Sequence, residues 1–117
     1  MKDFLKSFIY ALNGIGASLS EQRNLKVQTI IALITIGAGF YFDITATEWC
    51  FILLSIAAVI GLEMINTAIE SLVDLVTQER KPLAGKVKDV AAGAVLFASV
   101  MAVVTGVIIF RKYLLIE

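Results

Sequence analysis

The sequence lacks histidine, and it has one cysteine and one proline among its 117 residues. Without histidine, the chain cannot form a Ser-His or Cys-His nucleophile system or a histidine-led proton shuttle. The single cysteine, Cys50, allows neither an intrachain disulfide nor a CxxC metal knuckle. Any acid–base chemistry near neutral pH must therefore rest on a carboxylate or a lysine.

Charged residues are also few and evenly divided between the two signs. Ten are basic and ten are acidic, so the formal net charge is zero, and the basic excess that is typical of nucleic-acid binding is missing. Apolar residues make up 59% of the chain, which is more than a soluble domain of this length can bury. The composition predicts a membrane protein, with lipid around most of the apolar surface.

Three uncharged apolar runs divide the chain, at residues 27–42, 49–62 and 90–110. A membrane-spanning helix needs about 20 predominantly apolar residues. The third run has this length, the first reaches it if Lys26 and Asp43 lie at the interfaces, and the second continues its apolar pattern beyond Glu63. Strands are a poor alternative, because an open sheet edge cannot lie in hydrocarbon. The expected membrane helices are at about 26–43, 47–76 and 88–111.

The segment before the first run has an amphipathic pattern. Large apolar residues recur on one side of a helix, at Phe4, Phe8, Leu12, Ile15 and Leu19. The pattern is typical of a helix in the headgroup plane, and also of a core-facing helix in a soluble bundle. Beside three membrane helices we favour the first interpretation. The predicted fold is a single all-α membrane domain over 1–117, with an interfacial helix over about 1–22 before three transmembrane helices.

The placement of lysine and arginine predicts the orientation of the chain in the membrane. Basic residues precede the first run and lie between the second and the third, whereas the connector 43–48 has two acids and no base. Because short basic loops stay in the cytoplasm, we expect the N-terminus and the second connector to face the cytoplasm. Arg111 and Lys112, near an outward-facing C-terminus, argue mildly against this topology.

The most informative stretch is GLEMINTAIESLVD, residues 61–74. On a helix, one arc of about 80° collects three acids and an amide, at Glu63, Asn66, Glu70 and Asp74. We call these four residues the polar row. Ionisable groups at membrane depth are expensive and indicate a functional site. The alternative is that the helix has already left the bilayer at Glu63 and that the row is a solvated face.

The polar row is suited to two kinds of chemistry. It could hold Mg²⁺ together with phosphate oxygens and water, while Glu63, at its apolar end, serves as a general base for a hydroxyl. It could instead relay protons or bind a cation in a small oligomeric transporter that uses Glu63 or Glu70. Against a transporter, Glu70 and Asp74 lie together at one end of the helix.

The connector after the polar row, QERKPLAGKVKD, is rich in bases. Positive charge beside a metal-binding acidic row is what a nucleotide polyphosphate requires. Taken alone, these bases are better explained by the positive-inside rule and by contact with lipid headgroups. The sequence has no GxxxxGK[ST] or GxGxxG loop, so any nucleotide would be held by side chains on helices.

Together these residues resemble a known family. The motif ExxNxAIE at 63–70, then Asp74, then Lys88 and Asp89, is similar to the prokaryotic integral-membrane diacylglycerol kinases, which include undecaprenol kinases. The resemblance covers nearly the whole chain. It implies a homotrimer of three-span subunits in the bacterial cytoplasmic membrane. It also implies Mg²⁺-dependent transfer of the ATP γ-phosphate to the hydroxyl of a lipid alcohol at the cytoplasmic interface.

The resemblance also implies roles for individual residues. Glu63 matches the general base, Asn66 lies beside it in the catalytic site, and Glu70 matches a Mg²⁺ ligand. Positions that match nucleotide contacts are Tyr10, Asp74, Glu79, Lys86, Lys88 and Asp89.

At one position the sequence departs from the family. A second metal-binding glutamate is expected shortly before the first span, where an ungapped alignment places Gln22 directly after Glu21. Glutamine offers a carbonyl oxygen without charge, which would weaken Mg²⁺ binding. Either Glu21 takes the place of the missing ligand, or the site holds its metal more loosely; we expect Glu21 to be the second metal ligand.

The lipid is less sharply defined. The amino-acid sequence of residues 81–84 and 88–96 resembles undecaprenol kinases more than diacylglycerol kinases, so we favour undecaprenol over 1,2-diacylglycerol as the substrate. Both lipids offer one primary hydroxyl and long apolar tails, which a pocket distinguishes only weakly.

Overall fold

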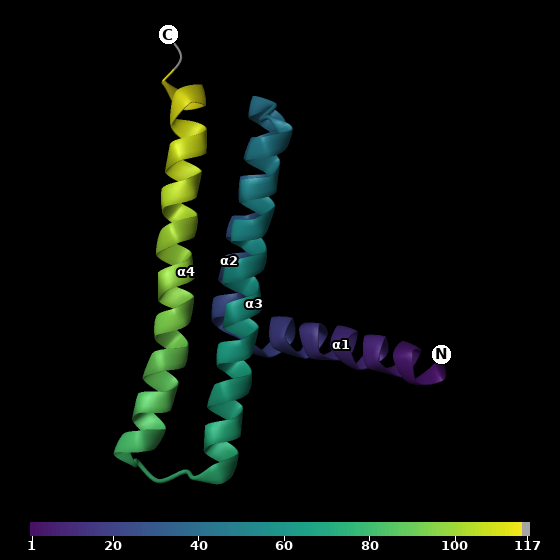
Figure 1. The fold of residues 1–117 in the computed structure, drawn as a ribbon, viewed down its shortest axis with the longest axis vertical. Coiled ribbons are helices and arrows are strands. Elements are labelled where there is room, and N and C mark those ends of the chain that lie inside the picture. Colours follow the sequence, from purple (N-terminus) through teal and green to yellow (C-terminus); the bar gives the residue numbers. More distant parts are fainter. Residues whose placement is uncertain (116–117) are drawn as a thin grey trace.

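The computed structural model describes residues 1–115, which form four helices (Figure 1). In chain order they are α1 (Lys2–Glu21), α2 (Arg23–Phe42), α3 (Ala46–Val76) and α4 (Pro82–Leu114). No strand occurs in this part of the chain. The predicted all-α class, with a shorter N-terminal helix ahead of three apolar helices that are long enough to span a membrane, is confirmed.

The three apolar helices differ in length. At 1.5 Å per residue, α2 reaches about 30 Å, which equals the thickness of the hydrocarbon core, whereas α3 and α4 reach about 46 and 50 Å. The turn at 43–45 makes α2 and α3 level at one end, which we call the turn end. The excess length of α3 and α4 therefore lies at the opposite end, where residues 77–81 connect them; we call this the connector end (Figure 1).

The helix α1 runs across the direction of the other three (Figure 1). A single residue, Gln22, separates it from α2, and its extended backbone (φ −102°, ψ 114°) turns the chain. None of the residues of α1 is buried. This arrangement is the one expected of an amphipathic helix that lies along a membrane surface while α2 enters the bilayer.

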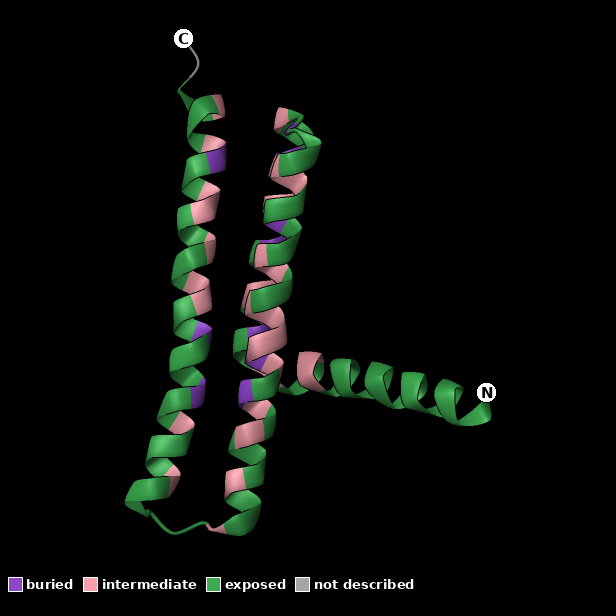
Figure 2. Ribbon diagram, in the orientation of Figure 1, coloured by how far each residue is buried: buried purple, intermediate pink, exposed green. Residues whose placement is uncertain are grey.

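The bundle buries few side chains within one chain. The helix α3 packs against both α2 and α4, and the side chains that face outward are exposed along most of each helix (Figure 2). Many of these are large and apolar, such as Leu54 on α3 and Phe97 on α4. Such a surface is stable in lipid or against further protein, but not in water.

The turn end is the most firmly packed part of the molecule. Asp43 closes α2 with a left-handed backbone (φ 52°). Thr45 and Glu48 then start α3 with a capping box, in which each side chain accepts the backbone N–H of the other residue. Tyr113 of α4 donates to Glu48 Oε1 at 2.6 Å, and Lys112 pairs with the same carboxylate. Three helices are therefore tied together at this end.

Gly39 is required by close packing at the turn end. A Cβ atom built at this position would lie 2.7 Å from Cη2 of the Trp49 ring and 3.1 Å from Cδ1 of Ile44. The ring of Trp49 is itself held against Phe40, with ring centroids 4.9 Å apart. Gly37, two residues earlier on the same helix, has nothing within 4 Å of a Cβ.

We therefore expect Gly39→Ala and Gly37→Ala to change stability in opposite directions. The first should lower the free energy of unfolding by about 1–3 kcal/mol through overpacking, and the second should raise it by up to about 1 kcal/mol through helix propensity. Reversible unfolding in mixed detergent micelles measures both. Equal effects of the two variants would contradict the close approach of Trp49 to α2.

Candidate functional site

The polar row begins in a buried part of α3 and ends in an exposed part. Glu63 is 5% exposed and Asn66 is 7% exposed, whereas Glu70 and Asp74 are exposed. Glu63 and Asn66 are the two buried polar residues of the described chain, so they are not part of a solvated face. A buried carboxylate is strongly unfavourable unless hydrogen-bond donors surround it, and the neighbouring amides provide them.

Both oxygens of the Glu63 carboxylate accept hydrogen bonds from amide side chains. Gln28 of α2 donates from Nε2 to Oε1 at 3.1 Å, and Asn66 donates from Nδ2 to Oε2 at 3.3 Å. The same Nδ2 donates to Oε1 of Glu70 at 3.0 Å. Asn66 thus bridges two carboxylates on one helix face, and Gln28 joins this cluster from the neighbouring helix.

Two acceptor atoms of the cluster have no partner. Oδ1 of Asn66 and Oε1 of Gln28 are buried and make no hydrogen bond within the described residues. A buried acceptor without a partner is unfavourable by about 1–3 kcal/mol. Amide and carboxylate oxygens are hard ligands that suit Mg²⁺, and they also accept from a hydroxyl or a water molecule. The cluster is therefore chemically suited to a cation or to a hydrogen-bond donor.

The donor set fits a magnesium ion that shares its coordination with phosphate. No group of three or more acidic, cysteine or histidine side chains comes together within the described part of one chain. Mg²⁺ does not require such a group, because it is commonly held by one or two carboxylates while substrate phosphates and waters complete the octahedron. Glu70 and the free oxygen of Asn66 are the ligands that this site offers.

The exposed end of the polar row faces a lysine of α4. Lys88 Nζ lies 2.7 Å from Oδ1 of Asp74, so the first turns of α4 place a positive charge one turn beyond Glu70. Both side chains are substantially exposed, and an ion pair of this kind stabilises a fold by at most about 1 kcal/mol. The pair therefore matters more for placing charge at the connector end than for stability.

The other residues that the sequence marked as site candidates make no hydrogen bond or ion pair with the row among residues 1–115. Glu21 and Gln22 lie at the junction of α1 and α2, where α1 also contacts α3. Tyr10 is exposed on α1, about 16 Å along the helix from Glu21. The remaining candidates are exposed around the connector and the start of α4, at Glu79, Lys86 and Asp89.

Gln28 is the residue of this cluster that the sequence analysis missed. It stands near the start of the uncharged run 27–42, whose composition indicates only a membrane span. A polar amide in such a run is the available signal, because a polar group in a membrane helix needs a partner. The sequence did not reveal that its partner is Glu63, 35 positions further along the chain.

Comparison with known proteins gives a consistent result. A family model described as prokaryotic diacylglycerol kinase matches residues 9–110. The undecaprenol kinase of Bacillus subtilis is 39% identical over 107 residues, which cover 92% of this chain and 87% of that protein. The diacylglycerol kinase of Synechocystis is 39% identical over 89% of this chain and 60% of that protein. The diacylglycerol kinase of Escherichia coli K12 is 28% identical over 93% of this chain and 89% of that protein.

We expect Gln28 and Glu63 to be energetically coupled. In a double-mutant cycle of Gln28→Ala and Glu63→Ala, the coupling free energy should be about 1–3 kcal/mol, because Gln28→Ala alone leaves a buried carboxylate oxygen without its donor. Reversible unfolding in detergent measures it. Gln28→Ala with Asp74→Ala is the control pair, and these changes should be additive. Additivity in both cycles would show that the amide does not support the carboxylate.

Proposed function

The chain belongs to the prokaryotic diacylglycerol kinase family and is a membrane lipid kinase, and from this premise we propose that it transfers the γ-phosphate of ATP to the hydroxyl of a lipid alcohol. The proposal places the reaction at the cytoplasmic face of a bacterial cytoplasmic membrane, with the N-terminus in the cytoplasm. The observation that carries the proposal is the hydrogen-bonded cluster of Glu63, Asn66 and Glu70, which continues into the charged pair of Asp74 and Lys88.

Glu63 is the proposed general base. It lies at the buried end of the row and keeps acceptor capacity beyond its two amide donors. The lipid hydroxyl gives its proton to this carboxylate while its oxygen forms a bond to the γ-phosphorus. The bond between that phosphorus and the oxygen bridging to the β-phosphate breaks, ADP leaves, and Glu63 later releases the proton to water. Asn66 positions the carboxylate throughout.

The charged part of the row is the proposed binding site for the metal and the nucleotide. Glu70 and Oδ1 of Asn66 would hold Mg²⁺, which when bound neutralises phosphate charge in phosphoryl transfer. Lys88, placed beside Asp74, would add positive charge toward the polyphosphate. The other proposed nucleotide contacts are Tyr10, Asp74, Glu79, Lys86 and Asp89.

The assembly and the lipid are also proposals. A homotrimer would give the large exposed apolar surface of α2, α3 and α4 further partners besides lipid. Undecaprenol is supported as the substrate by 39% identity over most of both chains to a protein named undecaprenol kinase. A transporter has no comparable support, because the named relatives are lipid kinases and the charges gather at the connector end.

The purified protein should consume ATP only when both Mg²⁺ and a lipid alcohol are present, with undecaprenol the better substrate in a side-by-side assay with 1,2-diacylglycerol. Glu63→Gln should keep its fold and assembly but lose about 10²–10⁴-fold in turnover, because the attacking hydroxyl loses its base. Asp43→Asn, at the turn end, is the matched control and should stay active. Wild-type turnover in Glu63→Gln would remove this residue as the base.

The second metal ligand can be tested at the junction of α1 and α2. If Glu21 binds the metal, Glu21→Ala should raise the Mg²⁺ concentration needed for half-maximal activity by about tenfold, since mutation of groups around a metal site commonly weakens affinity 10–100-fold. Gln22→Glu should then leave it unchanged. A marked fall in the Mg²⁺ requirement of Gln22→Glu, with Glu21→Ala unaffected, would instead identify position 22.

A further inference from the structure

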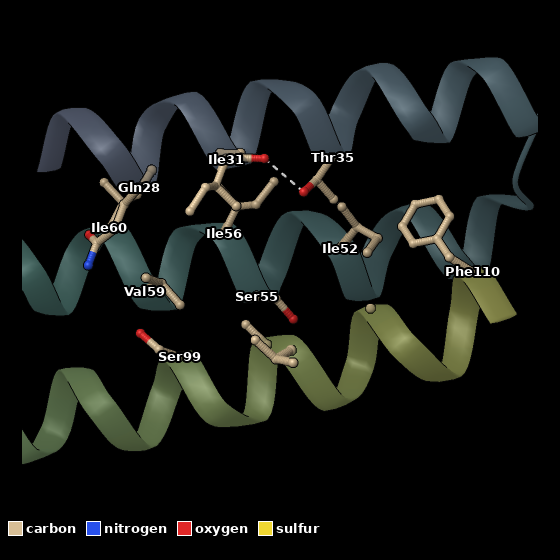
Figure 3. Close-up of a pocket in the computed structure, with 14 residues that line it drawn as sticks. Gln28, Ile31, Thr35, Ile52, Ser55, Ile56, Val59, Ile60, Ser99 and Phe110 are labelled. Carbon is tan, nitrogen blue, oxygen red and sulfur yellow. Dashed lines mark hydrogen bonds between the residues drawn. The ribbon is translucent and has the colours of Figure 1, made fainter. Parts of the chain in front are cut away.

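Gln28 lies on the buried face of α2, a helix whose main neighbour is α3. Leu25 and Ala32, three residues before it and four residues after it, are 1% and 8% exposed, and side chains at this spacing share one face of a helix. From this face Gln28 reaches toward α3 (Figure 3), where its Nε2 donates to Oε1 of Glu63 at 3.1 Å. The packing of α2 therefore fixes the backbone from which the amide extends.

The carboxylate of Glu63 needs more than one anchor to be held in a fixed orientation. The last torsion angle of a glutamate side chain, which sets the plane of the carboxylate, has a broad energy minimum. Asn66 holds Oε2, but it stands on the same helix as Glu63, and a single hydrogen bond leaves the plane free to turn. Gln28 holds Oε1 from a second helix. Together the two donors fix the position of the carboxylate and the direction of its remaining lone pairs.

The amide of Gln28 serves Glu63 at the expense of its own oxygen. Its nitrogen faces the carboxylate, and its Oε1 is left buried without a hydrogen-bond partner among the described residues, which is unfavourable for the fold. A buried polar group that satisfies a neighbour but not itself indicates a role in the site, because functional sites are where a fold tolerates such costs. The amide is also neutral. A cation at this position would stabilise the negative charge that Glu63 loses when it takes up a proton.

We propose that Gln28 is a positioning residue, which holds the carboxylate of Glu63 in the orientation that accepts the proton of the lipid hydroxyl. The proposal rests on the proposed kinase function, in which Glu63 is the base, and it adds a residue of α2 to the machinery. A displacement of about 1 Å at a reacting group can cost about 10²-fold in rate. The signature of such a role is a loss of turnover while the substrates still bind normally.

The test removes the donor at position 28 and then restores it. Gln28→Met keeps the length of the side chain but has no N–H, whereas Gln28→His returns an N–H at the ε position when its ring is neutral, at about pH 8. Thr35→Val is the matched control, because it also removes a polar group from α2, but one whose hydroxyl donates to the Ile31 carbonyl of the same helix. Turnover and the KM values for ATP and for the lipid alcohol are measured for each variant, and its oligomeric state is compared with that of the wild type.

Gln28→Met should lower turnover by about 10–100-fold, as is common when a supporting hydrogen bond of a site is lost, and should leave both KM values close to those of the wild type. Gln28→His should recover most of the lost turnover, and Thr35→Val should match the wild type. A residue that only packs α2 on α3 would give the opposite order, because methionine resembles glutamine in shape more closely than histidine does.

The side-chain amide signal of Gln28 gives a second measurement, which does not depend on turnover. The chain has three glutamines, Gln22, Gln28 and Gln78, so labelling glutamine with nitrogen-15 gives three pairs of amide signals in an NMR spectrum. Glu63→Gln should shift the pair from Gln28, because its hydrogen bond loses a charged acceptor, and should leave the other two pairs in place. If Gln28→Met does not assemble, this shift decides the proposal.

Three results would overturn the positioning role and leave the kinase function standing. These are wild-type turnover in Gln28→Met, turnover in Gln28→His that is no higher than in Gln28→Met, and a Gln28 signal that Glu63→Gln does not move. A loss that appears only in the KM values would also overturn it, since Gln28 would then act in substrate binding. If the wild type phosphorylates no lipid alcohol, the kinase function itself fails, and the positioning role fails with it.

Discussion

A carboxylate inside a membrane helix must have hydrogen-bond partners, and this requirement shapes the connector half of the molecule. Glu63 is 5% exposed. One of its carboxylate oxygens accepts a hydrogen bond from an amide of its own helix, and the other accepts one from an amide of α2. The contact with Gln28 fixes how α2 lies along α3. Because α2 begins only five residues before Gln28, the carboxylate lies about 8 Å from the end of that helix. The proposed base is thus sheltered from water yet close to the start of α2.

The unequal lengths of the helices then separate two environments along one face of α3. Where α2 is present, the face is covered, and the row consists of a buried acid and a buried amide. Beyond the start of α2, the main neighbour of α3 is α4; Glu70 and Asp74 are exposed there, and Lys88 can reach the row. A hydroxyl carried by a lipid and a phosphate carried by a soluble nucleotide require these two environments in adjacent positions. Because α3 is longer than the bilayer is thick, its polar row passes through both the covered and the exposed environment.

Periodicity was sufficient to predict the helices and the polar row, because apolar runs and helical spacing are local properties of the sequence. How far α3 extends beyond the start of α2 was not predictable in this way, since it depends on a contact between Gln28 and Glu63, which are 35 positions apart. Lys88 lies beside Asp74, a position that the short connector allows, and its contact with a nucleotide stays a prediction. Tyr10 stays a prediction, because α1 leads toward its N-terminus away from the site within one chain (Figure 1). Glu21, at the end of α1 that meets the bundle, also stays a prediction.

The firmest packing and the proposed chemistry lie at opposite ends of this bundle. At the turn end, the capping box, the bonds from Tyr113 and Lys112 to Glu48, and the packing of Trp49 on Gly39 hold three helices together. At the connector end, the side chains beyond Asn66 are mostly exposed, and the ion pair that links α3 and α4 there joins two exposed residues. Regions with few buried contacts open at low free energy, and binding sites are drawn from such regions. A firmly packed turn end allows the other ends of α3 and α4 to stay loosely packed without loss of the fold, so that substrates can enter between the charged side chains and leave again.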